Sequence, residues 1–345
     1  MTDPVEKYLI RNELTLKRWH RFRRNKLAMA SVFVLAIFFF FSFTAELWAN
    51  NRPHVMSYKG HIYAPLFFDY HPSAFGRDDI FVMDYRSMKL ENGDWWIWPM
   101  IQWDPYESNS AVDSYPARPS QYNIFGTDDR GRDVFTRLLY GFRYTMVFAV
   151  GSWLLTYLVG CAIGAAMGYW GGMVDLIGMR IVEIVESLPV FFVLITVISI
   201  FSPGLFLLIC FMVVFEWTGI SHYMRGQFLS LRKREYVEAA RAIGASHSRI
   251  VFKHILPNGL TPIITFSPFA IAGYVMTLAT MDYLGLGLRP PTPSWGELFA
   301  QALKYFTIAE WLVWAPMGFM LITLTLLINI GLAIRDAFDA RSSIG

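Results

Sequence analysis

Charged residues are absent from five long stretches of the chain. Residues 27–45, 144–174, 187–215, 255–281 and 311–334 contain no Asp, Glu, Lys or Arg, and these stretches are 19, 31, 29, 27 and 24 residues long. A helix needs about 20 mostly apolar residues to cross the hydrocarbon core of a bilayer, so each stretch can span a membrane. Outer-membrane barrels instead show alternating strands of about ten residues. The pattern therefore predicts an all-α polytopic membrane protein.

Two clusters of basic residues predict the number of spans. Residues 1–26 contain eight Lys and Arg, and a second basic cluster lies within 225–253. Because Lys and Arg favour the cytoplasmic side of the membrane, an even number of spans should separate the two clusters. The run 187–215 must then supply two spans. Ser202-Pro203-Gly204 is a suitable break, since proline and glycine interrupt helices.

The predicted architecture has six transmembrane helices, with both termini in the cytoplasm. The third and fourth spans are expected near 181–201 and 205–223, and the last two near 259–284 and 311–334. The expected segments are a basic N-terminal segment at 1–26, a first transmembrane helix at 27–47, a periplasmic insertion at 48–142, a five-helix core at 143–335 with a cytoplasmic loop at 225–258, and a cytoplasmic tail at 336–345.

The insertion is the largest polar region of the chain. Roughly 46–142 contains nine Lys and Arg and thirteen Asp and Glu, and it includes the aromatic stretch Trp95-Trp96-Ile97-Trp98. Two interpretations remain open. The aromatic side chains could form a docking surface for an external protein, or a belt that rests on the bilayer interface.

Composition agrees with a membrane protein. Charged residues make up 17% of the 345 residues, against roughly 25% in soluble proteins. Hydrophobic residues make up 54%. The net charge of +3 is too small and too dispersed to indicate nucleic acid binding. Cys161 and Cys210 both lie inside apolar runs, so we expect no disulfide framework.

Glycine recurs at every fourth position in the second predicted span. Gly160, Gly164, Gly168 and Gly172 fall along one side of a helix. Small residues on one side let another helix approach closely. We interpret the four glycines as a helix-packing surface.

A few acidic residues lie in or beside the apolar runs. Glu183 follows Arg180 by one helical turn, which predicts a local ion pair. Glu216 and Asp282 are candidates for a translocation path, because charges deep in a membrane usually face a cavity or a partner. They could also lie at helix ends. An ion-coupled secondary transporter that uses Glu183, Glu216 and Asp282 is therefore an alternative function.

Residues 235–258 predict two short helices joined at a glycine on the cytoplasmic side. Glu235 to Ile243 contains good helix formers and no breaker. Gly244 allows a sharp reversal, and Ser246 is a plausible N-cap for the second helix. The remaining expectations are Ile250, Ile255 and Leu256 as apolar anchors, Pro257 as the end of the segment, and Ala239 and Ala240 as a shallow surface for another protein.

The order of residues in this loop resembles the EAA loop of ABC importer permeases. The matching positions are Glu238, Ala239, Ala240, Gly244, Ile250, Leu256 and Pro257. In that family the loop is a coupling helix that docks into a cleft on the ATP-hydrolysing subunit. The resemblance implies that these seven residues form the ATPase-coupling interface.

Three further segments are similar to the dipeptide and oligopeptide permeases of this family. They are Phe125-Gly126-Thr127-Asp128 with Gly131-Arg132-Asp133-Val134, Leu284-Gly285-Leu286-Gly287 with Pro290-Pro291-Thr292-Pro293-Ser294-Trp295-Gly296, and Arg335-Asp336-Ala337-Phe338-Asp339. Asn123-Ile124 stands where the family often has His-Pro. The long region 46–122 and the pattern from Trp19 to Asn25 resemble the Yej-type branch, which is associated with peptides and peptide-like antibiotics such as microcin C.

The resemblance implies the fold of a type I ABC importer permease in the bacterial inner membrane, with a large periplasmic insertion. The chain has no G-x-x-x-x-G-K-[ST] sequence, the loop that holds nucleotide phosphates. We therefore expect a transport subunit that is not an enzyme, with no catalytic residue, metal site or bound cofactor, while a partner ATPase uses ATP and Mg²⁺. The expected partners are a related permease in a heterodimer, ABC ATPase subunits or a fused ATPase, a periplasmic peptide-binding protein and the lipid bilayer, but not nucleic acid.

Overall fold

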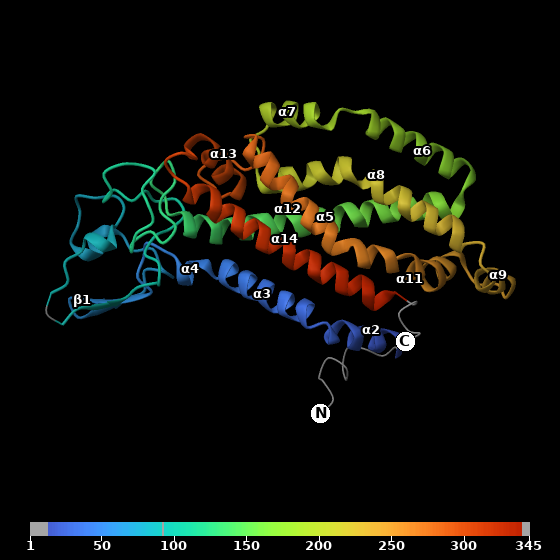
Figure 1. Ribbon diagram of the computed structural model, residues 1–345, viewed down its shortest axis with the longest axis horizontal. Helices are drawn as coiled ribbons and strands as arrows, with labels where there is room; N and C mark the ends of the chain where they lie inside the picture. Colours follow the sequence, from blue (N-terminus) through green and yellow to red (C-terminus); the bar gives the residue numbers. More distant parts are fainter. Residues whose placement is uncertain (1–12, 92, 340–345) are drawn as a thin grey trace. The chain divides into compact units, whose positions relative to one another are not determined.

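The computed structural model is built mainly of helices (Figure 1). It describes residues 13–91 and 93–339. The elements are α2 (Glu13–Arg24), α3 (Lys26–Phe43), α4 (Ala45–Trp48), β1 (Val55–Tyr58), β2 (His61–Tyr63), η1 (Pro72–Phe75), η2 (Tyr85–Ser87), β3 (Trp95–Ile97), α5 (Val134–Trp170), α6 (Gly172–Ser187), α7 (Val190–Ile200), α8 (Leu205–Leu231), α9 (Glu235–Ala242), α10 (His247–Arg249), the π-helix η3 (Ile250–Ile255), α11 (Leu256–Gly259), α12 (Thr261–Tyr283), α13 (Trp295–Tyr305) and α14 (Trp311–Phe338).

Among the described residues, five helices are long and apolar enough to cross a membrane, namely α3, α5, α8, α12 and α14. The pair α6 and α7 passes the same test together, but it is bent by 72°. Leu188 and Pro189 separate the two helices, and Leu188 is extended, with φ −76° and ψ 132°. A proline disfavours the helical conformation of the residue before it. The polytopic helical fold is confirmed, whereas a continuous third span near 181–201 is corrected to a broken one.

Several predicted boundaries also shift. The helix α5 begins at Val134, so its first turns come from the region assigned to the insertion at 48–142. The helix α8 continues to Leu231 inside the predicted loop, and α14 continues to Phe338 inside the predicted tail. Residues 1–12 of the predicted N-terminal segment and 340–345 of the tail lie outside the described residues.

The described residues form two compact units. The first contains the residues up to 35, residues 146–281 and the residues from 322 onward. The second contains residues 36–145 and 282–321. The first unit holds the predicted cytoplasmic loop and most of the apolar helices, and the second holds the insertion and α13.

In the first unit, α5 and α8 lie side by side with their backbones almost in contact (Figure 1). A Cβ atom added at Gly164 would lie 2.3 Å from the carbonyl oxygen of Ser221. At Gly160 and Gly168, the nearest carbonyl oxygens of α8 would be 2.5 and 2.6 Å away. These distances leave no room for a side chain. Three glycines of the stripe therefore allow a close helix–helix approach of the kind seen with small residues in membranes.

Gly172 has a different role. The helix α5 ends at Trp170, and Gly171 and Gly172 turn the chain into α6 with φ of 66° and 53°. A Cβ atom added at Gly172 would have no atom within 4 Å. Positive φ is accessible to glycine at little cost. The structure thus corrects the assignment of Gly172 to the packing stripe, because this residue serves the turn.

Polar contacts also join elements of the first unit. The carboxylate of Asp175 in α6 pairs with the guanidinium of Arg225 in α8, with Nη2 and Oδ2 2.7 Å apart. Arg232, after α8, donates a hydrogen bond of 3.1 Å to the carbonyl oxygen of Tyr169 in α5. The start of the loop, directly after α8, is therefore held in a fixed position relative to α5.

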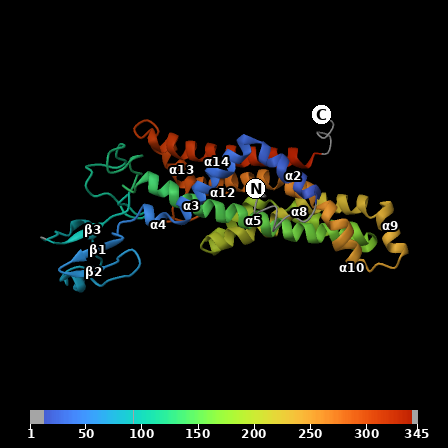
Figure 2. The ribbon, with the colours of Figure 1, turned by 90° about the horizontal axis from the view of Figure 1, so that it is seen from below.

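The second unit includes a small antiparallel sheet with strand order β2-β1-β3 (Figure 2). In β1, Met56 pairs with Tyr63 on one side and with Trp96 on the other. The core around this sheet consists of Met56, Phe75, Tyr85 and Met88, with Trp96 and Trp98 among the side chains packed against it. The insertion therefore has a hydrophobic core of its own, and part of its tryptophan stretch faces inward.

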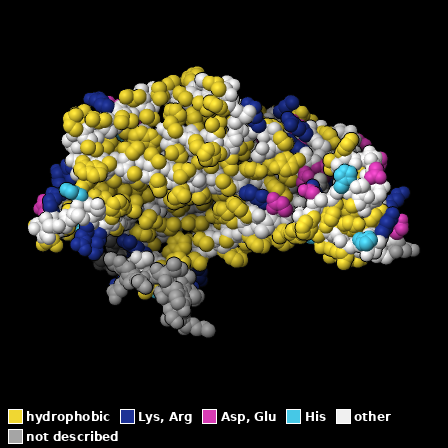
Figure 3. Space-filling model, turned by 180° about the vertical axis from the view of Figure 1, so that it is seen from behind, with side chains coloured by type: hydrophobic (Ala, Val, Ile, Leu, Met, Phe, Trp, Pro, Cys, Tyr) yellow, Lys and Arg dark blue, Asp and Glu magenta, His cyan; other side chains and the backbone are white. Residues whose placement is uncertain are grey.

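Large hydrophobic side chains remain exposed on the helices of the first unit. Figure 3 shows such side chains over the upper part of one face, where α6, α7 and α8 lie. Examples with exposed fractions between 51% and 79% are Met173, Ile177, Ile184, Phe192 and Phe206. Extended apolar surface of this kind is typical of helices that contact lipid or a partner helix.

The close approach of α5 and α8 gives a stability prediction. We expect Gly164→Ala to destabilise the fold by about 1–3 kcal/mol, because its methyl group overlaps the α8 backbone. Gly226→Ala is the matched control in α8, since a Cβ atom there has no neighbour within 4 Å. The midpoint of thermal unfolding of the purified chain in detergent should fall for the first variant only. Equal midpoints would contradict the packing account.

Candidate functional site

The helix α9 ends in a tight glycine turn. Gly244 has φ +79°. The backbone N–H of Ala245 donates to the carbonyl oxygen of Ala240, and that of Gly244 donates to the carbonyl oxygen of Arg241, both at 3.0 Å. These two bonds are the pattern that closes a helix before a left-handed glycine. Next, Ser246 Oγ accepts a hydrogen bond of 3.3 Å from the N–H of Arg249 and caps α10. The reversal and the cap occur where the sequence predicts them.

One side of the loop packs into the core of the first unit. The buried loop residues are Val237, Ala240, Ile250 and Ile255, and they cluster with Tyr169 of α5, Met224 and Phe228 of α8, and Ile263 of α12. Ala240 and Ile250 are only 6% and 1% exposed. Their assignment to the surface that meets an ATPase is therefore corrected. These two side chains support the loop from within, because burial of apolar surface holds them against α5 and α8.

The opposite side of the loop is open. Glu238 and Ala239 are exposed, and Ile243 beside the glycine turn is 86% exposed. Leu256 is half-buried, and Pro257 stands in the first turn of α11. Proline is suited to the first turn of a helix, so Pro257 opens α11 and does not end the segment as predicted.

Sequence reasoning missed two features of this loop. It did not select Ile243, because no local pattern marks an apolar residue beside a turn glycine as exposed. It also did not pair His247 with Tyr169, whose hydroxyl oxygen lies 2.7 Å from His247 Nδ1. That contact holds α10 against the end of α5, and no local sequence pattern joins residues so far apart.

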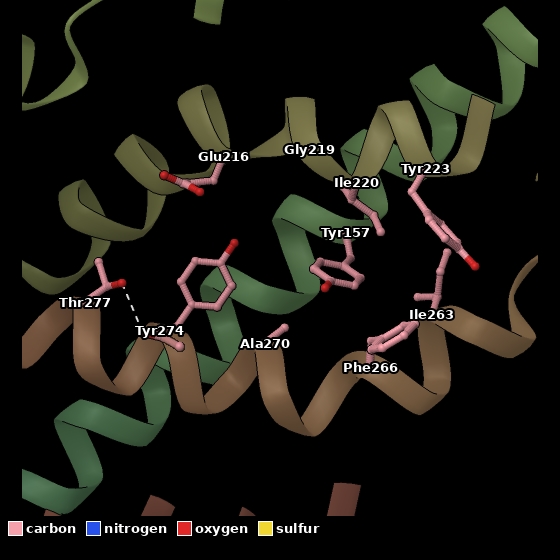
Figure 4. A pocket seen from close by; sticks show the side chains of 11 residues that line it. Tyr157, Glu216, Gly219, Ile220, Tyr223, Ile263, Phe266, Ala270, Tyr274 and Thr277 are labelled. Carbon is pink, nitrogen blue, oxygen red and sulfur yellow. Dashed lines mark hydrogen bonds between the residues drawn. The ribbon is translucent and has the colours of Figure 1, made fainter. Parts of the chain in front are cut away.

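A pocket of about 620 Å³ lies between α5, α8 and α12 in the first unit (Figure 4). Glu216 of α8 lines it, together with Tyr157 of α5 and Tyr274 of α12. Figure 4 shows the hydroxyl of Tyr274 pointing toward the carboxylate of Glu216. The structure therefore places Glu216, a candidate for the translocation path, at a cavity.

Asp282 has a structural role instead. Asp282 lies at the end of α12 and is only 7% exposed. Its Oδ1 accepts a hydrogen bond of 2.6 Å from the N–H of Leu288, and the hydroxyl of Ser294 donates to its Oδ2. A Cβ atom added at Gly287 would lie 1.8 Å from Oδ1. The carboxylate thus organises the turn after α12, which corrects its assignment to the translocation path.

The other acids near the apolar runs have partners. Glu183 pairs with Arg180 in the same turn, as predicted. Glu186 Oε1 lies 3.1 Å from Nε2 of His222 in α8. Both acids are partly exposed, so these contacts contribute little to stability.

Four charged side chains form a buried network that joins α13 to the start of α5 and to the segment before it. Arg132 Nε donates to Asp128 Oδ2 at 2.7 Å, and Arg132 Nη2 lies 2.9 Å from Glu297 Oε1 in α13. Arg137 also pairs with Glu297, and its Nη1 donates to the carbonyl oxygen of Pro105 at 2.8 Å. Two positive charges face two negative charges. Buried ions require such pairing because of their desolvation penalty.

Asn123, the first residue of the Asn123-Ile124 pair noted above, is also buried. Its Nδ2 donates to Asp133 Oδ1 at 2.9 Å, and its Oδ1 accepts from Asn109 Nδ2 at 2.7 Å. Burial raises the pKa of the Asp133 carboxyl, against the lowering effect of the bonds from Asn123 and the N–H of Thr136. In this chain Asn123 links the insertion to the start of α5.

Comparison with known protein families gives two matches. The model described as "Binding-protein-dependent transport system inner membrane component" matches residues 160–343. The model described as "N-terminal TM domain of oligopeptide transport permease C" matches residues 16–79. The first match covers the loop, α8, α12 and the last turns of α5, and it contains every residue lining the pocket except Tyr157.

Similar proteins extend over nearly the whole chain. The Peptidoglycan transport system permease protein YejE of Agrobacterium fabrum is 37% identical, over 95% of this chain and 93% of its own length. The Inner membrane ABC transporter permease protein YejE of Escherichia coli is 36% identical, over 95% and 97%. The Oligopeptide transport system permease protein OppC of Bacillus subtilis is 30% identical, over 93% and 88%.

The buried network predicts that removing the charge of Glu297 strongly destabilises the fold. Glu297→Gln leaves two buried guanidinium groups facing one carboxylate, so we expect a loss of about 3–5 kcal/mol in the free energy of unfolding. Glu310→Gln is the control, because Glu310 is exposed, and we expect a change within about 0.5 kcal/mol. Denaturation of the purified chain in detergent measures both. Equal free energies of unfolding for the two variants would show that the network does not stabilise the fold.

Proposed function

The chain belongs to the binding-protein-dependent family of ABC importer permeases, in the branch of the oligopeptide and Yej-type permeases, and we propose that it forms part of the membrane path for peptides or peptide-like compounds. Members of this family are multi-pass inner membrane subunits that transport and do not catalyse reactions. The chain is therefore a transport component and not an enzyme. The proposed peptide class follows the names of two relatives, one named for peptidoglycan transport and the other for oligopeptide transport.

The geometry of the loop is the observation that carries the proposal. Ala239 of α9 and Ile243 directly after it are exposed. The inner side of the same loop packs against α5, α8 and α12 through Val237, Ala240 and Ile250. A partner that moves α9 would therefore move these three helices with it, since packed cores transmit displacement. The same three helices line the pocket that contains Glu216. The loop is thus suited to couple a partner's movement to the membrane path.

The proposed partner at this loop is an ATP-hydrolysing subunit, either as two chains or as one fused chain. ATP and Mg²⁺ would be bound by that subunit. A related permease would form the other half of the membrane path, and a periplasmic binding protein would deliver the peptide. ATP and the loaded binding protein would act by stabilising different conformations of the permease pair.

The orientation of the termini is also part of the proposal. Arg18 of α2 lies over the ring of Phe338, 4.2 Å from its centroid, and Arg21 donates to the carbonyl oxygen of Asp339 at 2.8 Å. The N-terminal helix and the end of α14 therefore lie together within the first unit. The basic residues of α2 favour the cytoplasmic side for both.

The ion-coupled alternative receives less support. A proton or ion relay needs several acids open to one path. Asp282 accepts hydrogen bonds from the turn that it organises, and Glu183 pairs with Arg180. Only Glu216 of these three acids lines the pocket. A single open carboxylate does not make a relay.

Gly244 provides a test of coupling. We expect Gly244→Val to lower peptide uptake per ATP hydrolysed by about tenfold, because a left-handed conformation costs an L-residue roughly 1–2 kcal/mol and the turn beside Ile243 must change. A Cβ atom added at Gly244 has no atom within 4 Å, so the effect comes from the backbone conformation. Uptake and ATP hydrolysis are measured in proteoliposomes that contain the complete importer.

Gly244→Asn is the matched control, because asparagine tolerates the left-handed conformation. It should retain most of the coupling. If Gly244→Val transported normally for each ATP hydrolysed, the loop would not be the coupling element. Transport by the chain alone, driven by a proton gradient without ATP, would contradict the proposed function itself.

A further inference from the structure

The pocket between α5, α8 and α12 combines one acid with several aromatic rings. Its lining residues are Tyr157, Glu216, Gly219, Ile220, Tyr223, Ile263, Phe266, Ala270, Gly273, Tyr274 and Thr277. None of these eleven described residues is Lys, Arg or His, and Glu216 is the one acid among them. Glu216 has no ion-pair partner among the described residues. The wall therefore presents one uncompensated negative charge.

Glu216 lies far from both ends of its helix. It is the twelfth of the 27 residues of α8, which places it about 17 Å from the start at 1.5 Å per residue. Tyr274 is the fourteenth of the 23 residues of α12. A carboxylate at such depth is costly unless it faces a water-filled cavity or a partner group. Its position at a pocket satisfies this requirement.

The aromatic residues determine the kind of partner. Figure 4 shows Tyr157 and Tyr274 reaching into the same space as Glu216, with Tyr223 and Phe266 farther along the pocket. Aromatic rings attract cations through their negative faces. Tyrosine hydroxyls also offer hydrogen-bond acceptors to an N–H donor. A carboxylate surrounded by tyrosines is suited to an ammonium or guanidinium group.

A bare metal ion fits these walls less well. Metal ions require several oxygen, nitrogen or sulfur ligands that converge on one point. No group of three or more His, Cys, Asp or Glu that could hold a metal ion occurs among the described residues. The volume of about 620 Å³ also matches an organic group and not a single ion.

We propose that Glu216, with Tyr157 and Tyr274, binds a cationic group of the transported compound, an amino terminus or a Lys or Arg side chain, at mid-depth in the membrane path. This inference rests on the proposed function, because it concerns the cargo of the same path. It adds a preference within the permease itself, separate from the selection made by a binding protein. The pocket holds the cation while the loop on the same helices responds to the ATPase.

The test measures direct binding to the assembled importer in lipid nanodiscs, without a binding protein. The probes are trilysine and the neutral peptide N-acetyl-trialanine amide, which have the same number of residues. We expect the wild-type complex to bind trilysine at least about tenfold more tightly, the size expected for a hydrogen bond to a charged group. Glu216→Gln should abolish the preference, and Glu216→Asp should restore much of it.

Glu183→Gln is the control, since Glu183 is outside the pocket and paired with Arg180. It should keep the wild-type preference. Absence of a preference in the wild type, or its persistence in Glu216→Gln, would overturn the proposal. Equal loss of both peptides, or loss of complex assembly, in Glu216→Gln would also overturn it, because Glu216 would then serve structure.

Failure of the proposed function gives a different result. In that case the wild-type importer with its binding protein takes up neither peptide in response to ATP. The charge preference measured in nanodiscs does not depend on uptake. The two outcomes are therefore distinguishable.

Discussion

The close packing of α5 against α8 is the constraint on which the first unit depends. Gly160, Gly164 and Gly168 bring the two backbones together, which places Tyr169 of α5 beside Met224 and Phe228 of α8. Those side chains form the surface on which the loop packs. Farther along the same helices, the pocket opens. A side chain at any of the three glycines would separate the helices and disturb the loop and the pocket together.

Several buried or partly buried charges of the described residues have a local partner. In the second unit, Asp128, Arg132, Arg137 and Glu297 neutralise one another, and Asp282 is bound by the turn that it organises. In the first unit, Asp175 pairs with Arg225. These charges build structure because each has a local partner, as burial requires. Glu216 differs from them, because it lines a pocket and has no ion-pair partner among the described residues, which is the basis for proposing it as a binding residue.

Sequence reasoning succeeded where the signal is local or periodic. Long apolar runs predicted the helices, and Gly244 and Ser246 predicted the turn and the cap of the loop. It failed where tertiary packing decides. The residue types of Ala240 and Ile250 do not show which side of the loop faces inward. The four-residue spacing from Gly168 to Gly172 does not show that α5 has already ended at Trp170. The partners of Asp282 and the network around Glu297 join residues that only the folded chain brings together.

We propose that the exposed side of α9 and the adjoining Ile243 contact the ATPase. The most direct measurement uses the Ile243→Cys variant of a chain in which Cys161 and Cys210 have been replaced. A short thiol–amine reagent then tests whether position 243 cross-links to the ATPase subunit in the assembled importer. Ile62→Cys, 73% exposed in the insertion, is the control. We expect a product that contains the ATPase from position 243 and none from position 62. No product from position 243, or a product from position 62, would contradict the account.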